Sequence, residues 1–480
     1  MVNHTRIVLA RVGLWLVSVG LSLGLASAAQ NQEIPPVPTD VQPILKQPKK
    51  PKKPRLQKYS DQLPQTPSLP PAFTIPVEPL GFSPHGDFYI GRHNSIVSLD
   101  FLDENRLLFT FQVRGLMSRA WSTGLEVRPV RAVVVGLPDG KIQSEAEWTL
   151  HDRARYLWML NDGNFLLRDR DSLQQGDSSL AMKPSLRFPG RLLWIEMDPS
   201  QRFMDTNFVE PRPEPKPEVV ANLASAKSGK SVEKTNPGPK NDLVVRTLNR
   251  ESGQLVLENR LELTETDPVD FDGYIEAESA MLSGLFARVQ LPINSEGYLL
   301  PLRDNGENQW HLQLKHFAGG SRELGGLEST CMPSGEFISE GMVVVTACPP
   351  AGGWDVVAIS TQGRQLWQTH ASSQEVWPVL VRSRDGSRLA RESVFLNHSI
   401  DERHPLDPAA VKGQMVKVLD AADGKVALEA PVSPPLDAGG NVAISPSGRR
   451  VAILNAGTIQ VFDLPPAAPV SFEDSKPSQH

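Results

Sequence analysis

Apolar and polar residues alternate along most of the chain after about residue 95, in short runs separated by turns rich in Gly, Asp and Asn. A period of two is typical of β-strands with one buried face, and two such runs around a tight turn predict a β-hairpin. Hairpins of this kind are predicted at 96–111, 156–167, 192–208, 379–394 and 442–454. Helical spacing is scarce, and its best candidate is 277–289, so the pattern predicts an all-β fold.

Two kinds of glycine-containing turn recur at nearly the same step along the chain. Gly386 and Gly448, in hairpin turns, are 62 residues apart, while Gly363 and Gly424, in a second type of turn, are 61 residues apart. A four-stranded unit that recurs at roughly 50–60 residues is typical of a propeller blade. We therefore expect residues 80–466 to form a single β-propeller of about seven four-stranded blades, with six to eight as the range.

The predicted blades differ in how completely the sequence supplies their strands. Their ranges are 95–150, 155–188, 191–263, 270–320, 325–370, 377–432 and 439–466. The last supplies three strands, so we expect Phe82–Ile90 to provide the fourth and to close the ring, which removes exposed sheet edges. Residues 211–240 are predicted to form a low-complexity loop, and residues 467–480 a disordered tail.

Three short motifs resemble known propeller repeats. Ser445–Arg450 (Ser-Pro-Ser-Gly-Arg-Arg) resembles the Ser-Pro-Asp-Gly-Arg turn of WD-repeat, quinoprotein-like and TolB-like blades, and Gly81–Gly86 resembles a degenerate copy. Thr361–Trp367 is similar to the Gly-x-x-x-Trp ending of a quinoprotein-like repeat. The resemblance implies a fold and no particular activity, because propellers host enzymes, binding modules and scaffolds alike.

The N-terminus has the pattern of a secretory signal peptide. Arg6 and Arg11 precede an apolar run, Val12–Ala26, which is followed by small residues up to Ala29. The run is shorter than the roughly 20 apolar residues that a membrane-spanning helix needs, although an uncleaved N-terminal anchor is the alternative. Residues 1–28 are therefore predicted to be a signal peptide, and the rest to be exported to the periplasm or the extracellular space.

Residues 29–79 are predicted to be a disordered tether, because residues 30–80 contain thirteen prolines and no hydrophobic periodicity. The basic residues of this tether, which we predict either to be a solvated spacer or to contact an anionic surface, are Lys46, Lys49, Lys50, Lys52, Lys53, Arg55 and Lys58.

The net charge restricts the class of binding partner, and the two cysteines raise the question of a disulfide. The chain has a net charge of −6, and the predicted signal peptide carries positive charges only, so nucleic acid is an unexpected partner for the folded part. Cys331 and Cys348 bracket a predicted hairpin with a turn at Pro333–Gly335. In an oxidising compartment they could pair as a disulfide, while two separate buried thiols are the alternative.

Motifs that suggest chemistry are weak, and no catalytic residue, cofactor or metal is predicted. Gly176–Ser179 resembles a serine-hydrolase Gly-Asp-Ser without its companion motifs, and Ser228–Ser231 resembles the end of a phosphate-binding loop but follows no strand. Acidic residues gather without EF-hand spacing at Asp267, Asp270, Asp272, Glu276 and Glu278. The histidines show no zinc-site spacing, and the tryptophans mostly fall in predicted strands, where we expect packing between blades.

The sequence therefore favours an exported, non-catalytic binding or scaffold propeller with an unknown protein or cell-envelope partner. One alternative is a propeller enzyme, either a quinoprotein-like oxidoreductase or a hydrolase, with its site in the central funnel. Another alternative is a component of an envelope complex, tethered as TolB-like proteins are. Carboxylates or histidines converging on the channel would favour the enzyme, and an apolar or mixed rim would favour binding.

Overall fold

The computed structural model describes residues 67–83, 97–113, 128–151, 155–211, 241–262, 292–303, 308–397, 408–436 and 440–468. The chain divides into two units, 1–60 and 61–480, and every described residue belongs to the second. The predicted signal peptide, the basic residues of the tether, the helix candidate 277–289 and the tail beyond 468 lie outside the described residues. Most of the loop 211–240 also lies outside them.

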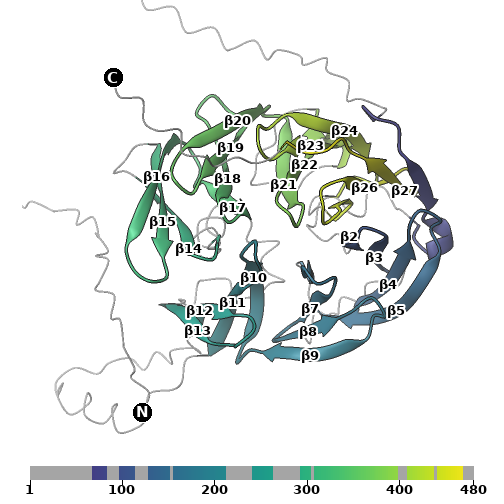
Figure 1. Cartoon of the computed structure of the whole chain (residues 1–480), viewed down its shortest axis with the longest axis horizontal. Helices are drawn as coiled ribbons and strands as arrows, with labels where there is room; N and C mark the ends of the chain where they lie inside the picture. Colours follow the sequence, from purple (N-terminus) through teal and green to yellow (C-terminus); the bar gives the residue numbers. More distant parts are fainter. Residues whose placement is uncertain are drawn as a thin grey trace, which may run out of the picture. The chain divides into compact units, whose positions relative to one another are not determined.

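The described residues form seven antiparallel sheets, arranged as the blades of a seven-bladed β-propeller (Figure 1). Blade 1 contains β2 (Val97–Asp103), β3 (Arg106–Gln112), β4 (Arg128–Gly136) and β5 (Ile142–Leu150). Blade 2 contains β6 (Leu157–Met159), β7 (Phe165–Asp169), β8 (Ser172–Gly176) and β9 (Met182–Arg187). Blade 3 contains β10 (Arg191–Met197), β11 (Phe203–Pro211), β12 (Asn241–Asn249) and β13 (Leu255–Glu262).

The remaining blades follow in chain order. Blade 4 contains β14 (Gly297–Arg303), β15 (Gln309–His316) and β16 (Ser321–Glu328). Blade 5 contains β17 (Ser334–Ser339), β18 (Met342–Ala347), β19 (Trp354–Ser360) and β20 (Gln365–Ala371). Blade 6 contains β21 (Glu375–Arg382), β22 (Arg388–Leu396), β23 (Val411–Asp420) and β24 (Val426–Val432). Blade 7 contains β25 (Val442–Ile444), β26 (Arg450–Asn455), β27 (Thr458–Asp463) and β1 (Phe73–Pro76).

The fold class and the blade number predicted from the sequence are confirmed, but one border between blades is wrong. The predicted border at 320–325 falls inside blade 4, where Gly319 and Gly320 form the turn between β15 and β16. Both glycines have positive φ values, as do Gly363 and Gly424, which also lie in turns between strands of one blade. Blade 4 has three strands among the described residues, where four were predicted.

The ring closes through its two ends, although with a different strand from the predicted Phe82–Ile90. β1 pairs antiparallel with β27, from Phe73 opposite Val461 to Pro76 opposite Thr458. An edge strand tolerates Pro76 because the missing N–H there need not join a ladder. Phe82 instead lies in the loop after β1, and residues 84–90 are outside the described residues. β1 belongs to the predicted tether 29–79, so the last part of that range is propeller rather than tether.

Hairpin turns form hydrogen bonds between neighbouring blades. The Ser447 N–H in the turn before β26 donates to Glu104 of blade 1 at 2.8 Å. In the same way, the Asn161 N–H of blade 2 donates to Gln201 of blade 3 at 2.7 Å. Glu340 of blade 5 accepts from the Ser295 N–H of blade 4 at 2.8 Å. The repeated turn thus serves both to reverse the chain and to satisfy backbone groups of the adjacent blade.

Candidate functional site

Hydrophobic clusters fill six of the seven joints between neighbouring blades. Each of these clusters contains buried side chains from both blades of its joint: blades 7 and 1, 1 and 2, 2 and 3, 4 and 5, 5 and 6, and 6 and 7. At the seventh joint, between blades 3 and 4, the buried Phe203 ring packs against Phe317. A groove with a volume of about 690 Å³ lies at this joint.

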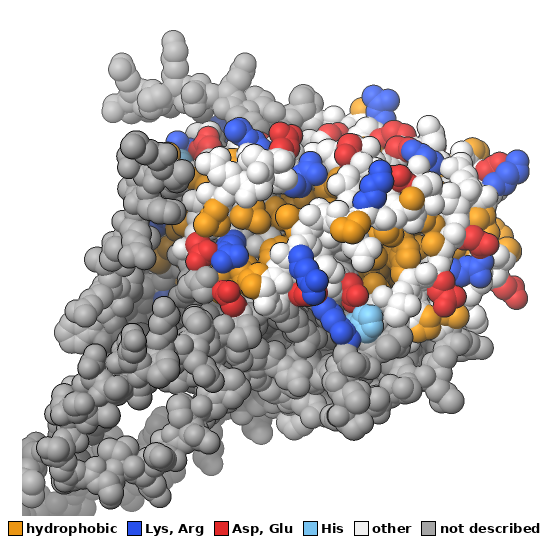
Figure 2. All heavy atoms as spheres, turned by 90° about the horizontal axis from the view of Figure 1, so that it is seen from below, with side chains coloured by type: hydrophobic (Ala, Val, Ile, Leu, Met, Phe, Trp, Pro, Cys, Tyr) orange, Lys and Arg blue, Asp and Glu red, His pale blue; other side chains and the backbone are white. Residues whose placement is uncertain are grey.

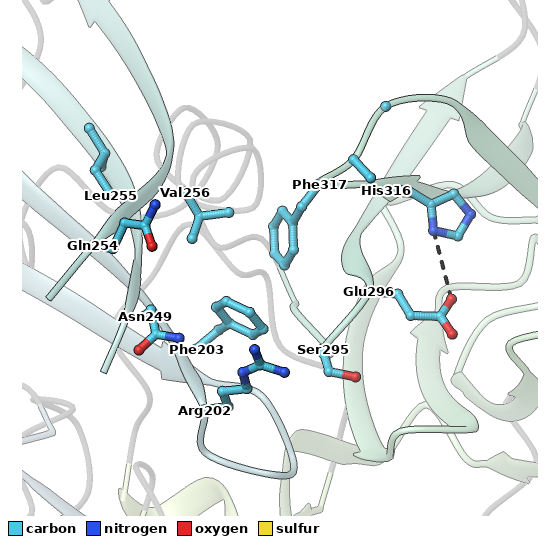
Figure 3. A pocket seen from close by; sticks show the side chains of 12 residues that line it. Arg202, Phe203, Asn249, Gln254, Leu255, Val256, Ser295, Glu296, His316 and Phe317 are labelled. Atoms are coloured by element: carbon cyan, nitrogen blue, oxygen red, sulfur yellow. Dashed lines mark ion pairs between the residues drawn. The ribbon is translucent and has the colours of Figure 1, made fainter. Parts of the chain in front are cut away.

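The walls of the groove come from loops and strand ends of the two blades (Figure 3). Blade 3 contributes Arg202, Phe203, Asn249, Gln254, Leu255 and Val256. Blade 4 and the segment before it contribute Ser295, Glu296, His316, Phe317, Ala318 and Gly319. We call this cavity the 3/4 groove.

The apolar wall on blade 3 arises from an irregularity in strand pairing. Leu248 pairs with Leu255, and Thr247 pairs with Leu257, so Val256 is the extra residue of a β-bulge. Bulges redirect side chains, and here Leu255 is 48% exposed and Val256 is 37% exposed. The corresponding bulge in blade 5 places Leu366 against the core shared by blades 5 and 6. Blades 1 and 6 have the same bulge, and the first residue of their outermost strand is also exposed, at Ile142 (43%) and Val426 (54%). What distinguishes blade 3 is therefore the exposed apolar residue Val256 at the bulge itself.

Two aromatic rings meet across the groove. The ring of Phe203 from blade 3 lies 5.5 Å from the ring of Phe317 from blade 4, at an interplanar angle of 52°. Phe203 is 9% exposed, and the Tyr298 ring lies 6.4 Å from the Phe317 ring. In Figure 3 the Val256 side chain points toward Phe317. The base of the groove is therefore apolar and contains aromatic rings from both blades.

The charged groups of the groove differ in how they are paired. Glu296 lies 3.7 Å from His316 and 3.9 Å from Arg322, so its carboxylate has basic neighbours. The guanidinium of Arg202 lies over the Phe203 ring, 5.2 Å from its centroid, and has no carboxylate partner among the described residues. Figure 3 shows this guanidinium between the two walls. A positive group with an apolar surround thus faces the open part of the groove.

A second group of charged side chains gathers near the centre of the ring, to which the first strand of each blade lies closest (Figure 1). The charges of Arg155 and Arg382 act on both Glu196 and Glu336, and those of Arg155 and Arg384 act on Asp100. These carboxylates belong to β10, β17 and β2, three different blades. Propeller topology therefore brings together charges that are far apart in the sequence, and we call them the central cluster.

Direct contacts hold several members of the central cluster in place. The Arg382 Nε lies 3.7 Å from Oε1 of Glu336. The indole N–H of Trp194 donates to Oε2 of Glu196 at 3.2 Å. The Arg155 guanidinium lies 5.4 Å from the centroid of the Trp158 ring, which packs edge-on against Trp194. Aromatic rings and a mixed set of charges therefore alternate in this region.

Burial dominates the electrostatics of the central cluster. Loss of hydration, followed by the nearby charge of Glu196, raises the pKa of Glu336 to about 7 despite Arg382 and Arg155. Burial likewise raises the pKa of Glu196 and Asp100 above the ordinary values. Asp205, which pairs across the sheet with Glu196, has a pKa raised well above its ordinary value by burial. A carboxyl with a pKa near neutrality can exchange a proton at physiological pH.

Two of the motifs singled out in the sequence are described by the structure, and neither lies among the residues named for the groove or the central cluster. Cys331 and Cys348 form a disulfide between the end of blade 4 and β18. In the Gly176–Ser179 segment, Asp177 accepts from the backbone N–H of Ser179 at 2.8 Å, as in an ordinary turn. The acidic residues 267–278, Ser228–Ser231 and the lysines of the tether lie outside the described residues. The described residues contain no group of three or more His, Cys, Asp or Glu placed to hold a metal ion.

Neither the groove nor the central cluster is predicted from the sequence. One signal for the groove was visible: the turn at Gly253 is followed by two adjacent apolar residues, Leu255 and Val256, which break the alternation. The corresponding turn at Gly424 is also followed by two adjacent apolar residues, Val426 and Ala427, so this pattern alone does not single out blade 3. No comparable signal marks Glu196 and Glu336, because charges 140 residues apart show no periodicity.

Two further features of the molecule are the distribution of charged side chains on its surface and the length of its helices. Figure 2 shows positive and negative side chains interspersed over the viewed face, with apolar side chains visible between them. No helix in the described part of the chain is both long enough and apolar enough to cross a membrane.

Comparisons with known proteins show likeness only at low similarity. No family model matches the chain, and no curated protein matches it. Acylaminoacyl peptidase from Pyrococcus horikoshii is 12% identical with a TM-score of 0.39, and the alignment covers 77% of this chain and 50% of that one. The chain thus spans about half the length of that peptidase.

Two further solved structures are similar to a comparable degree. The uncharacterized protein lmo1340 from Listeria monocytogenes is 10% identical with a TM-score of 0.39, and 82% of this chain aligns with 100% of it. TolB from Acinetobacter baumannii is 12% identical with a TM-score of 0.31, and 68% of this chain aligns with 70% of it. At these values the likenesses carry no argument about activity, so the function is argued from the site alone.

Proposed function

We propose that this protein is an exported binding propeller that recognises a segment of a polypeptide partner in the 3/4 groove. The observation that carries this proposal is the groove itself, in which exposed apolar side chains of blade 3 lie beside polar and charged groups of both blades.

The lining of the groove suits a polypeptide ligand. Apolar side chains left exposed beside polar ones are typical of protein interaction sites. Leu255, Val256 and Phe317 can receive an apolar side chain, while Gln254, Asn249 and Ser295 at the edges can bond to a peptide backbone. Each apolar side chain that the ligand buries contributes about 1.5–3 kcal/mol before the cost of ordering the ligand is subtracted.

Export remains part of the proposal and rests on two features. Residues 1–28 have the charge and hydrophobicity pattern of a signal peptide. The Cys331–Cys348 disulfide supports the same compartment, because disulfides persist mainly in oxidising surroundings.

A peptide display library panned on the purified protein tests the binding function. We expect the wild type to enrich peptides that Leu255→Lys retains at least tenfold less well, because a lysine places a charge on the apolar wall. The matched control is Val426→Lys, because Val426 begins the outermost strand of blade 6 as Leu255 does in blade 3 and is 54% exposed. Failure to enrich any peptide, or equal retention by all three proteins, would contradict the proposal.

An enzyme acting in the central cluster is the second candidate function, because the pKa of Glu336 is raised to about 7 beside Glu196. Such a carboxyl can serve as a general acid or base in glycoside or peptide hydrolysis. A hydrolase screen would then show an activity that Glu336→Gln abolishes and that Leu255→Lys leaves unchanged. Activity retained by Glu336→Gln would exclude this role.

A further inference from the structure

We infer that the ligand segment carries an Asp or Glu side chain next to an apolar residue, and that its carboxylate pairs with Arg202. This inference rests on the proposed function and adds the chemistry of the partner to it. Arg202 is the positive group that lies between the apolar walls in Figure 3. An acidic residue flanked by apolar ones would place opposite charge there and apolar groups on either side.

The pairing of the other charges near the groove supports this assignment. Glu296 already has His316 and Arg322 beside it, at 3.7 and 3.9 Å. Glu340, at the neighbouring turn, accepts hydrogen bonds from the N–H groups of Ser200 and Ser295 at 3.0 and 2.8 Å. These two carboxylates are therefore engaged with other groups, and Arg202 has no carboxylate partner among the described residues.

The surroundings of Arg202 make it selective for a carboxylate. Its guanidinium presents a planar set of N–H donors that fits a carboxylate with two parallel hydrogen bonds. The Phe203 ring beneath it, 5.2 Å from centroid to guanidinium, shields one face from water. Arg202 is exposed, so water and salt screen a charge pair formed with it. We therefore expect the acidic side chain to improve affinity about threefold to fivefold.

Four synthetic peptides test the inference, each acetylated at its N-terminus and measured by fluorescence anisotropy. The first contains Leu-Asp-Phe and ends in an amide, and the second differs only by Asn in place of Asp. The third is the Asn peptide with a free C-terminal carboxylate, and the fourth is Ser-Asp-Ser with an amide. We expect the Leu-Asp-Phe peptide to bind about threefold to fivefold more tightly than the Leu-Asn-Phe peptide and at least tenfold more tightly than the Ser-Asp-Ser peptide.

Substitutions in the protein identify the group that reads the carboxylate. Arg202→Gln should remove the difference between the Asp and Asn peptides, and that difference should also decline with added salt. The control is Arg187→Gln, because Arg187 is 81% exposed on blade 2 and outside the groove. A difference that persists in Arg202→Gln would overturn the inference.

The remaining outcomes separate this inference from the proposed function. If Asp and Asn peptides bind equally but lose affinity with Leu255→Lys, the groove binds peptides and only the carboxylate assignment is wrong. Tighter binding of the peptide with the free C-terminus would assign Arg202 to a chain end and overturn the side-chain assignment. If peptides bind only after residues 270–289 are deleted, the occupant is the chain's own segment, and the inference is also overturned.

Discussion

Two joints of the propeller differ in how far their apolar side chains are buried: the joint between blades 7 and 1, and the joint between blades 3 and 4. At the first, Ile75, Leu80 and Phe82 from the N-terminal segment join side chains of both blades in a cluster buried to within 3% exposure. At the second, Leu255 and Val256 are exposed, and Phe203 meets Phe317 in the lining of a groove. The joint of blades 7 and 1 buries its apolar side chains where the ring closes, whereas the joint of blades 3 and 4 leaves Leu255 and Val256 accessible.

This difference indicates that the joint of blades 7 and 1 serves stability and that the 3/4 groove serves binding. Regions with few buried apolar contacts contribute less to global stability and are the ones free to bind ligands. Substitutions at the 7/1 joint should therefore act on folding. Substitutions at the 3/4 groove should act on binding and leave folding almost unchanged.

Removal of β1 should produce the largest effect. A truncation that begins at residue 77 loses the strand paired with β27 and the Ile75 side chain, which is 2% exposed, whereas one that begins at residue 67 keeps both. We expect the shorter chain to lose on the order of 5 kcal/mol and to aggregate through the exposed edge of β27. Urea unfolding and size-exclusion chromatography measure this, and equal midpoints for both truncations would show that β1 does not hold the ring closed.

Truncation of one aromatic ring at each joint compares the two regions directly. Phe109 is fully buried between Phe82 at 5.3 Å and Phe111 at 5.0 Å, so Phe109→Ala should cost about 3–5 kcal/mol. Phe317→Ala should cost about 1 kcal/mol, because the half-buried Phe317 ring leaves an opening that water can enter rather than a closed cavity. Denaturant unfolding of both variants provides the comparison. A larger cost for Phe317→Ala would mean that the 3/4 joint is packed as firmly as the other.

Glu392, a buried acid at the joint of blades 6 and 7, should make the stability of the folded protein depend on pH. Burial raises the pKa of Glu392 to about 8, opposed in part by the Asn441 side chain. The folded protein therefore keeps this proton up to about pH 8, whereas the unfolded chain loses it near the ordinary value of 4.5. The stability that this group contributes is full below pH 4.5 and is lost as pH rises toward 8.

Glu392→Gln should remove this pH dependence, because an amide does not titrate. We expect the variant to gain roughly 2 kcal/mol over the wild type between pH 5 and pH 8, as judged from urea unfolding at both values. Glu145→Gln is the control, because Glu145 is 58% exposed in its ion pair with Arg131. Parallel pH profiles for the wild type and Glu392→Gln would contradict the assignment.

Most of the fold could be predicted because local patterns determine it. Alternating apolar residues and the turns at Gly386 and Gly448 report on hairpins within one blade, and their common spacing reports on the repeat. The error at the ring closure has a different origin. Phe73–Pro76 is a four-residue strand within a proline-rich stretch, and only its pairing with β27 distinguishes it from tether. Short strands of this kind owe their structure to a distant partner and not to their own pattern.

The candidate site was not predictable, because it depends on which blades become neighbours and how well they fill their joint. Strand periodicity and turn chemistry act over a few residues, so the amino-acid order alone predicts an all-β repeat of about seven blades. The contact of Phe203 with Phe317, the position of Arg202 in a groove and the effect of Glu196 on Glu336 follow from the folded arrangement of distant segments. Packing and burial are properties of residues far apart along the chain, and they set both the exposed apolar surface and the raised pKa values.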